Sequence, residues 1–91
     1  MLEDIEVSVM MRDGLIRLFK GRALFMGRRL SFEGIVYPSV GGPNVSAQFT
    51  EESLKLLEGM GYGASEVEKL QEQLNTAILN GDARMVDELG E

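Results

Sequence analysis

Residues 5–19, IEVSVMMRDGLIRLF, decide the fold of this chain. Apolar residues at positions 5, 7, 9 and 11 alternate with Glu6, Ser8 and Met10, and this period of two predicts a half-buried β-strand. Asp13-Gly14 is a favoured pair for a two-residue type I′ turn, so Leu15 to Phe19 is expected to return as a second strand. The chain therefore begins as a β-hairpin.

The strands expected after this hairpin are one short apolar piece and two further runs, at residues 23–26, 30–37 and 45–49. Gly34 interrupts the longest of them, which indicates a bulge or a close approach of another backbone. The segment from Pro38 to Asn44 holds two prolines and Gly41-Gly42, and we expect it to be a loop.

Helix signals begin at residue 50. Thr50 is a good N-cap, and the carboxylates of Glu51 and Glu52 complement the dipole of a first helix with Leu54 and Leu57 as its apolar stripe. Glycines at positions 59, 61 and 63 are expected to end this helix.

A second helix is predicted to begin at Ser65, because Glu68 follows it at the spacing of a capping box. Its C-cap is expected at Asn80-Gly81. Its apolar positions recur at helical intervals, at Val67, Leu70, Leu74, Ala77 and Ile78. A last short helix is expected from Asp82, through Ala83, Val86 and Leu89.

Strands followed by helices predict an α+β fold. We expect a small antiparallel sheet or partly open barrel of four to five short strands, followed by two to three C-terminal helices. Ninety-one residues are enough for a single domain over 1–91, with 1–49 strand-rich and 50–91 helical and acidic.

The composition excludes several kinds of chemistry. The chain has no Cys and no His, so disulfides, a Cys nucleophile and a His-based triad are ruled out, and the two strongest zinc ligands are absent. We therefore expect no catalytic residues, no cofactor and no bound metal, and a protein that is not an enzyme. No apolar run is long enough to span a bilayer, and the N-terminus is acidic, so we expect a cytoplasmic protein without a membrane partner.

The net charge of -6 is unevenly divided. Residues 1–49 carry six basic and five acidic side chains, and residues 50–91 carry three basic and ten acidic ones, which gives +1 against -7. Opposite patches on one protomer allow head-to-tail contacts. Met10 stands out because it shares a strand face with Glu6 and Ser8, where an isolated monomer favours a polar side chain.

These features favour a structural or assembly protein that acts through protein–protein contacts, as a homo-oligomer or as a subunit of a larger assembly. We expect a phage or virion component as its setting. The expected interaction surface consists of Met10, Arg17, Lys20, Arg22, Arg28, Arg29, Glu66, Glu68, Glu72, Asp87 and Glu88.

Two alternatives stay open. The basic strand residues, interleaved with Phe19 and Phe25, could contact phosphates and stack on bases, as in a small nucleic-acid-binding module. Against this, the cations could be solvated charges on strand edges, with both phenylalanines in the core. The second alternative is a small acidic inhibitor that uses residues 50–91 to occupy the basic site of a nucleic-acid-handling partner.

Overall fold

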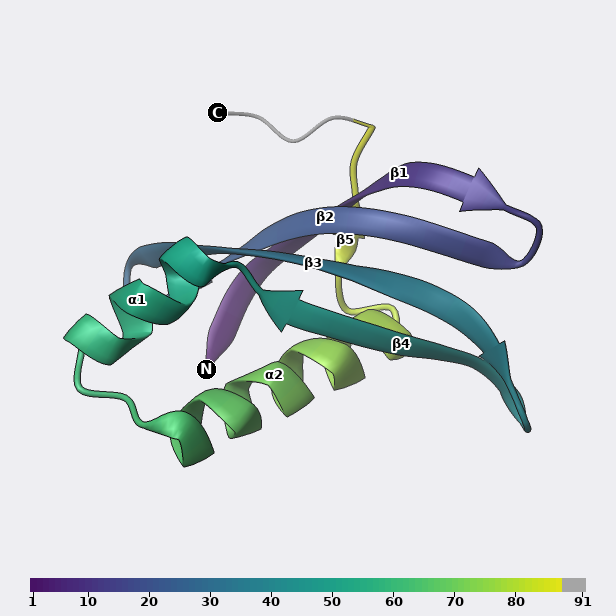
Figure 1. Cartoon of the computed structure of the whole chain (residues 1–91). Helices are drawn as coiled ribbons and strands as arrows, with labels where there is room; N and C mark the ends of the chain where they lie inside the picture. Colours follow the sequence, from purple (N-terminus) through teal and green to yellow (C-terminus); the bar gives the residue numbers. More distant parts are fainter. Residues whose placement is uncertain (88–91) are drawn as a thin grey trace.

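Two-residue turns connect four long strands in the computed structural model, which describes residues 1–87. The strands are β1 (Leu2–Asp13), β2 (Ile16–Phe25), β3 (Arg28–Ser39) and β4 (Gly42–Phe49) (Figure 1). The predicted first hairpin is confirmed, but its turn lies one residue later than expected, because Asp13 pairs with Ile16. Gly14 has a φ of 61° and Leu15 has no positive φ, the pattern of a type II′ turn rather than type I′.

The prediction of a loop from Pro38 to Asn44 is wrong. Pro38 pairs with Pro43 and Ser39 with Gly42, so the β3–β4 hairpin continues to a turn at Val40-Gly41. The prolines are tolerated because β3 extends past the start of β2 here, where the pairing of β2 and β3 ends at Arg17 and Val36. In this two-stranded projection each proline sits at an edge, where its missing N–H costs no ladder hydrogen bond.

The sheet is open and has the strand order β4-β3-β2-β1-β5, in which β5 (Arg84–Met85) pairs parallel to β1. The α+β class is confirmed, and the sheet is mixed rather than purely antiparallel. The prediction of a helix from Asp82 is wrong, because none of residues 82–87 is helical. Backbone groups of β1 offer a ladder to residues 84 and 85, and Val86 N donates to Val7 O at 2.9 Å. Leu89 lies outside the described residues.

The first helix, α1 (Glu51–Gly59), is attached to β3 through its N-terminal turn. The predicted cap is confirmed, since the Thr50 side chain accepts from Ser53 N, and Thr50 N donates to Ser31 O at 3.0 Å. Ser31 N donates to Ser53 Oγ at 2.8 Å, which buries Ser53 on the side facing the sheet. Leu57 is fully buried as expected, whereas Leu54 lies on the exposed side.

The second helix, α2 (Ala64–Leu79), begins one residue before Ser65. The predicted Ser65 cap is wrong, because Gly63 is the N-cap and Glu66 Oε1 accepts from Gly63 N at 3.1 Å. The predicted apolar stripe is confirmed: Leu70 and Leu74 are buried, and the other three members pack against the core. The C-cap at Asn80 is also confirmed.

The core lies between α2 and the sheet face that it covers. Phe19 and Phe32 meet edge-to-face there, with ring centroids 6.3 Å apart. The prediction of a close approach at Gly34 is confirmed, since a Cβ at this position would lie 2.5 Å from Ser46 O and 2.6 Å from Phe19 Cζ. Ordered from β1 to α2, the buried apolar residues are Ile5, Val7, Phe19, Ala23, Phe25, Leu30, Phe32, Ala47, Phe49, Leu57, Leu70 and Leu74.

Candidate interaction site

One face of the sheet is covered by α2, and within residues 1–87 the other face carries no helix. Phe19 is buried on the covered side, so its neighbours in β2, Leu18 and Lys20, point to the helix-free side. Residues opposite one another in a ladder share a face. Leu18 therefore shares the helix-free face with Ile35 and Ser46, and Lys20 shares it with Glu33 and Gln48.

A β-bulge places two methionines on this face. Val9 pairs with Phe19 and Met11 pairs with Leu18, so Met10 is an extra residue in β1. The alternation in the sequence placed Met11 on the same face as Val7 and Val9. This expectation is wrong, because the bulge turns Met11 to the helix-free side. Met10 and Met11 are each 58% exposed. Met10 is on the face that the sequence indicated.

We define the helix-free patch as Met10, Met11, Leu18 and Ile35. Three of its members, Met10, Leu18 and Ile35, line a hollow of about 560 Å³, whose lining also includes Lys20, Glu33, Ser46 and Gln48. Leu18 lies between Met11 and Ile35 in the ladder, and 40% of its surface is still exposed. Leu18 and Ile35 were missed by the sequence reasoning, because the bulge and the later turn decide which residues of β2 share the face of Met10.

The other end of the same face is held by an ion-paired cluster. Arg22 Nε donates to Glu6 Oε1 at 2.9 Å, and Arg84 Nη2 donates to Glu6 Oε2, which connects β2, β1 and β5. The hydrogen bonds from Arg22 and then Arg84 hold the pKa of Glu6 below its ordinary value, because they stabilise the carboxylate. The charged cluster and the helix-free patch therefore lie at opposite ends of the same face.

The outer edge of the sheet at β4 is closed by side chains. Ala47 N donates to Asn75 Oδ1 at 2.7 Å and Phe49 N donates to Gln71 Oε1 at 3.3 Å, both from α2. Val45 N donates to the Asn44 side chain at 2.9 Å, and Pro43, two residues earlier, has no N–H. An approaching strand therefore finds no free donor at these alternate positions of β4.

The five basic residues expected to form one surface are not gathered together. Lys20, Arg22 and Arg29 lie on the helix-free face, and Arg22 is paired with Glu6. Arg17 pairs with Val36 and Arg28 pairs with Phe25, so both arginines point to the face that α2 covers. Phe19 and Phe25 are only 3% and 4% exposed, so their rings are part of the core and cannot stack on bases.

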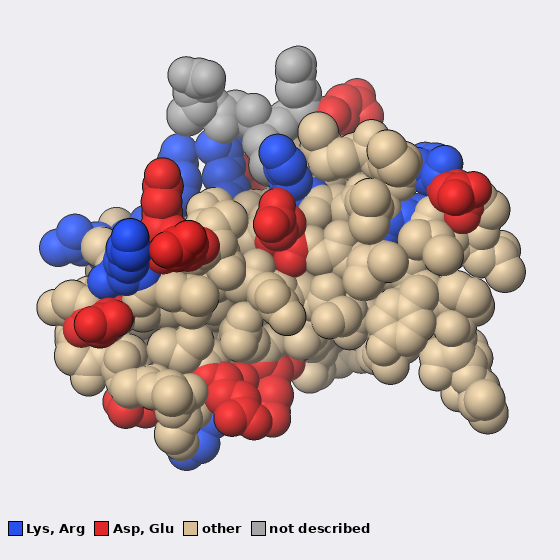
Figure 2. All heavy atoms as spheres, in the orientation of Figure 1, with Lys and Arg blue, Asp and Glu red and all other residues tan. Residues whose placement is uncertain are grey.

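The acidic residues expected at the interaction surface have different surroundings. Glu66 is engaged as the cap of α2, whereas Glu68 and Glu72 are exposed on that helix. Asp87 is exposed, and its carbonyl accepts from Ser8 Oγ at 3.1 Å. Glu88 lies outside the described residues. Figure 2 shows mainly acidic groups along the lower side, over α2, mixed signs on the strand side, and an uncharged projection where β3 and β4 turn.

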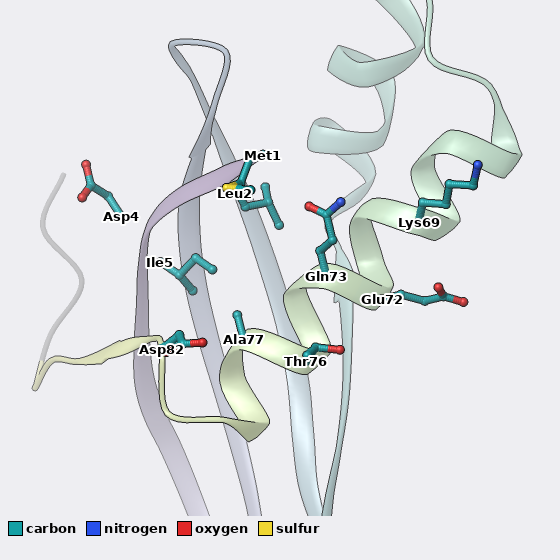
Figure 3. Close-up of a pocket in the computed structure, with 10 residues that line it drawn as sticks. All are labelled: Met1, Leu2, Asp4, Ile5, Lys69, Glu72, Gln73, Thr76, Ala77 and Asp82. Carbon is teal, nitrogen blue, oxygen red and sulfur yellow. The ribbon is translucent and has the colours of Figure 1, made fainter.

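Two grooves border the helices. The groove between β1 and α2, of about 650 Å³, has Leu2, Ile5 and Ala77 toward its interior, while Asp4 points away from it (Figure 3). The groove between α1 and α2, of about 730 Å³, is lined by Leu54, Tyr62 and Val67 with Glu58 and Glu68 among the polar residues. Within residues 1–87, no three His, Cys, Asp or Glu side chains lie close enough to hold a metal ion.

No protein-family model, curated protein or solved structure matches this chain. Neither of the two helices in the described part is long and apolar enough to cross a membrane. The helix-free face, the β4 edge and the grooves are the main surface features of the described residues.

Proposed function

We propose that this chain is a non-enzymatic assembly protein that binds protein partners through the helix-free face of its sheet. The observation that carries the proposal is the helix-free patch, four apolar side chains of which three line a hollow, on a face that carries no helix within residues 1–87. Contiguous apolar surface of this kind, bordered by polar residues, is typical of protein–protein contact sites. The closed β4 edge supports a contact through the face rather than through strand addition at that edge.

The surroundings of Glu6 favour a structural over a catalytic role for its carboxyl group. A general acid needs a raised pKa, and a general base needs free access to its substrate. Glu6 has a lowered pKa and both of its oxygens are engaged by arginines. Its position is better suited to fixing β5 against β1 than to moving protons.

The test of the proposal is the mass of the native species. Sedimentation velocity and native mass spectrometry, over concentrations from low micromolar to millimolar, should show a species heavier than the 10.1 kDa chain. Replacing two patch residues, Met10→Ser with Leu18→Ser, should remove this species. The matched control is Val40→Ser, which removes an exposed apolar side chain at the β3–β4 turn, outside the patch, and should leave the mass unchanged.

Assembly that survives the patch substitutions, or that is equally lost in the Val40 variant, would contradict the proposal. The alternatives give other results. A mobility shift with DNA or RNA at low salt, lost when Arg28 and Arg29 are replaced, would favour nucleic-acid binding. A single tight partner that binds the helices, with no self-association, would favour the acidic inhibitor. A virion setting stays a prediction.

A further inference from the structure

We infer that the partner at the helix-free face is a second copy of this chain, packed face to face about a two-fold axis that runs along the strands between β2 and β3. This inference rests on the proposed function and adds the partner and its register. It is carried by the order of side chains across the strands, by the charge of the face and by its area.

The order of side chains across the strands is self-complementary. From β1 to β4, one row reads Met11, Leu18, Ile35 and Ser46. Rotation about an axis between β2 and β3 reverses the row in the second copy. Leu18 of one copy then faces Ile35 of the other, and the large Met11 faces the small Ser46 beside the hollow. Methionine suits this position, because its flexible side chain fills irregular space.

The neighbouring row adds charge complementarity. From β2 to β4 it reads Lys20, Glu33 and Gln48, whereas Ser8 of β1 is buried and bonded to the Asp87 carbonyl. The same rotation brings Lys20 of each copy opposite Glu33 of the other. Both side chains are exposed, and no salt bridge found among residues 1–87 engages either of them. One apolar contact and one ion pair, each made twice, therefore follow from a single axis.

The charge of each surface indicates which side meets a copy of itself. Together with Arg84 and Asp87 at its rim, the helix-free face carries four cations and five carboxylates, which sum to -1: Lys20, Arg22, Arg29, Arg84, and Glu3, Glu6, Asp13, Glu33, Asp87. The two helices carry six carboxylates and two lysines, which sum to -4. Contact between two helical surfaces would bring like charges together, whereas the sheet faces are nearly neutral and mixed in sign.

The area is sufficient for a weak dimer. The shortest of the four long strands has 8 residues. With strands about 4.8 Å apart and a rise of about 3.3 Å per residue, the shared face measures roughly 19 Å by 26 Å. Two such faces bury on the order of 1,000 Å² in total, near the lower limit of specific interfaces. A face-to-face contact about a two-fold axis closes at two copies.

Charge reversal across the axis tests this register. Lys20→Glu places two carboxylates opposite each other at both contacts, and Glu33→Lys does the same with two ammonium groups. Each variant alone should therefore dimerise at least about tenfold more weakly than the unchanged chain. An equimolar mixture restores both ion pairs and should form a heterodimer. Isotope labelling of one variant identifies that species by native mass spectrometry.

The matched controls are Lys69→Glu and Glu68→Lys, two exposed charge reversals on α2, which should neither weaken the dimer nor complement each other. Thermal unfolding of each variant confirms that it is folded. A dimer that depends on the helix-free patch, but shows no rescue in the mixture, overturns the two-fold register and leaves the proposed function standing. A species heavier than 10.1 kDa that contains one copy of this chain and a different protein bound through the patch has the same consequence.

Discussion

Glu6 is the residue at which charge and architecture are most closely connected. Its carboxylate accepts hydrogen bonds from Arg22 in β2 and Arg84 in β5, two positions far apart in the sequence. Its side chain retains only 15% exposure, and these arginines lower its pKa. A group whose pKa is lowered by folding stabilises the folded state while it is ionised.

We expect Glu6→Gln to lower the stability most at neutral pH. The contribution of Glu6 is present above the ordinary pKa of 4.5 and is lost as the pH falls through the lowered pKa of the folded state. The difference in unfolding free energy between the unchanged chain and the variant should therefore shrink as the medium becomes acidic. Urea unfolding at several pH values measures it. A difference that is constant with pH would contradict the role of the carboxylate, and Glu3→Gln on the same strand is the control.

The edge of β4 shows how one element protects another. Asn75 and Gln71 lie one helical turn apart on α2, and their side-chain carbonyls accept from alternate backbone amides of β4. The helix thus acts as a substitute for a neighbouring strand.

Asn75→Ala should lower the unfolding free energy by about 1 kcal/mol, because the amide of Ala47 loses its acceptor. Combined with Gln71→Ala, it should also increase aggregation through the uncovered β4 edge. Chemical denaturation and light scattering measure the two effects. Gln73→Ala on the same helix is the control, since Gln73 is exposed and faces the groove toward β1. Equal losses in both variants would contradict the protection of the edge.

Local signals in the sequence were enough to predict most elements. The alternation in residues 5–9, the cap at Thr50 and the apolar stripe of α2 depend on neighbours along the chain, and the structure confirms them. The errors occur where a segment distant in the sequence determines the local secondary structure. The prolines of the β3–β4 hairpin are tolerated because β2 has ended, and residues 84 and 85 become a strand because β1 offers an edge.

At the scale of the whole molecule, salt distinguishes the proposed dimer from a head-to-tail assembly. Two chains with a net charge of -6 repel each other, and salt screens this repulsion, while it also weakens the close pairs of Lys20 and Glu33. Because the two effects oppose each other, the dissociation constant should change less than about tenfold between low and high salt. Sedimentation equilibrium measures it. A steep loss of affinity with salt would instead favour contact between oppositely charged patches.

The candidate site was only partly predictable. Met10 stood out as an apolar residue on a polar strand face, and it is exposed there beside Leu18 and Lys20. Met11, Leu18 and Ile35 could not be assigned to that face with it, because the bulge that changes the register is set by the pairing of β1 with β2. The charge difference between the two halves of the chain also misled, since Arg84 from the acidic half joins the sheet.

The parallel pairing of β5 with β1 has a consequence for the order of events during synthesis. Glu6 leaves the ribosome long before Arg84, and at about 5 to 20 residues per second the delay is on the order of ten seconds. The hairpins β1–β2, β2–β3 and β3–β4 can form in that interval, since each pairs neighbours in sequence. The first strand is thus the last to receive its second neighbour, and a nascent chain is most exposed to unwanted pairing at β1.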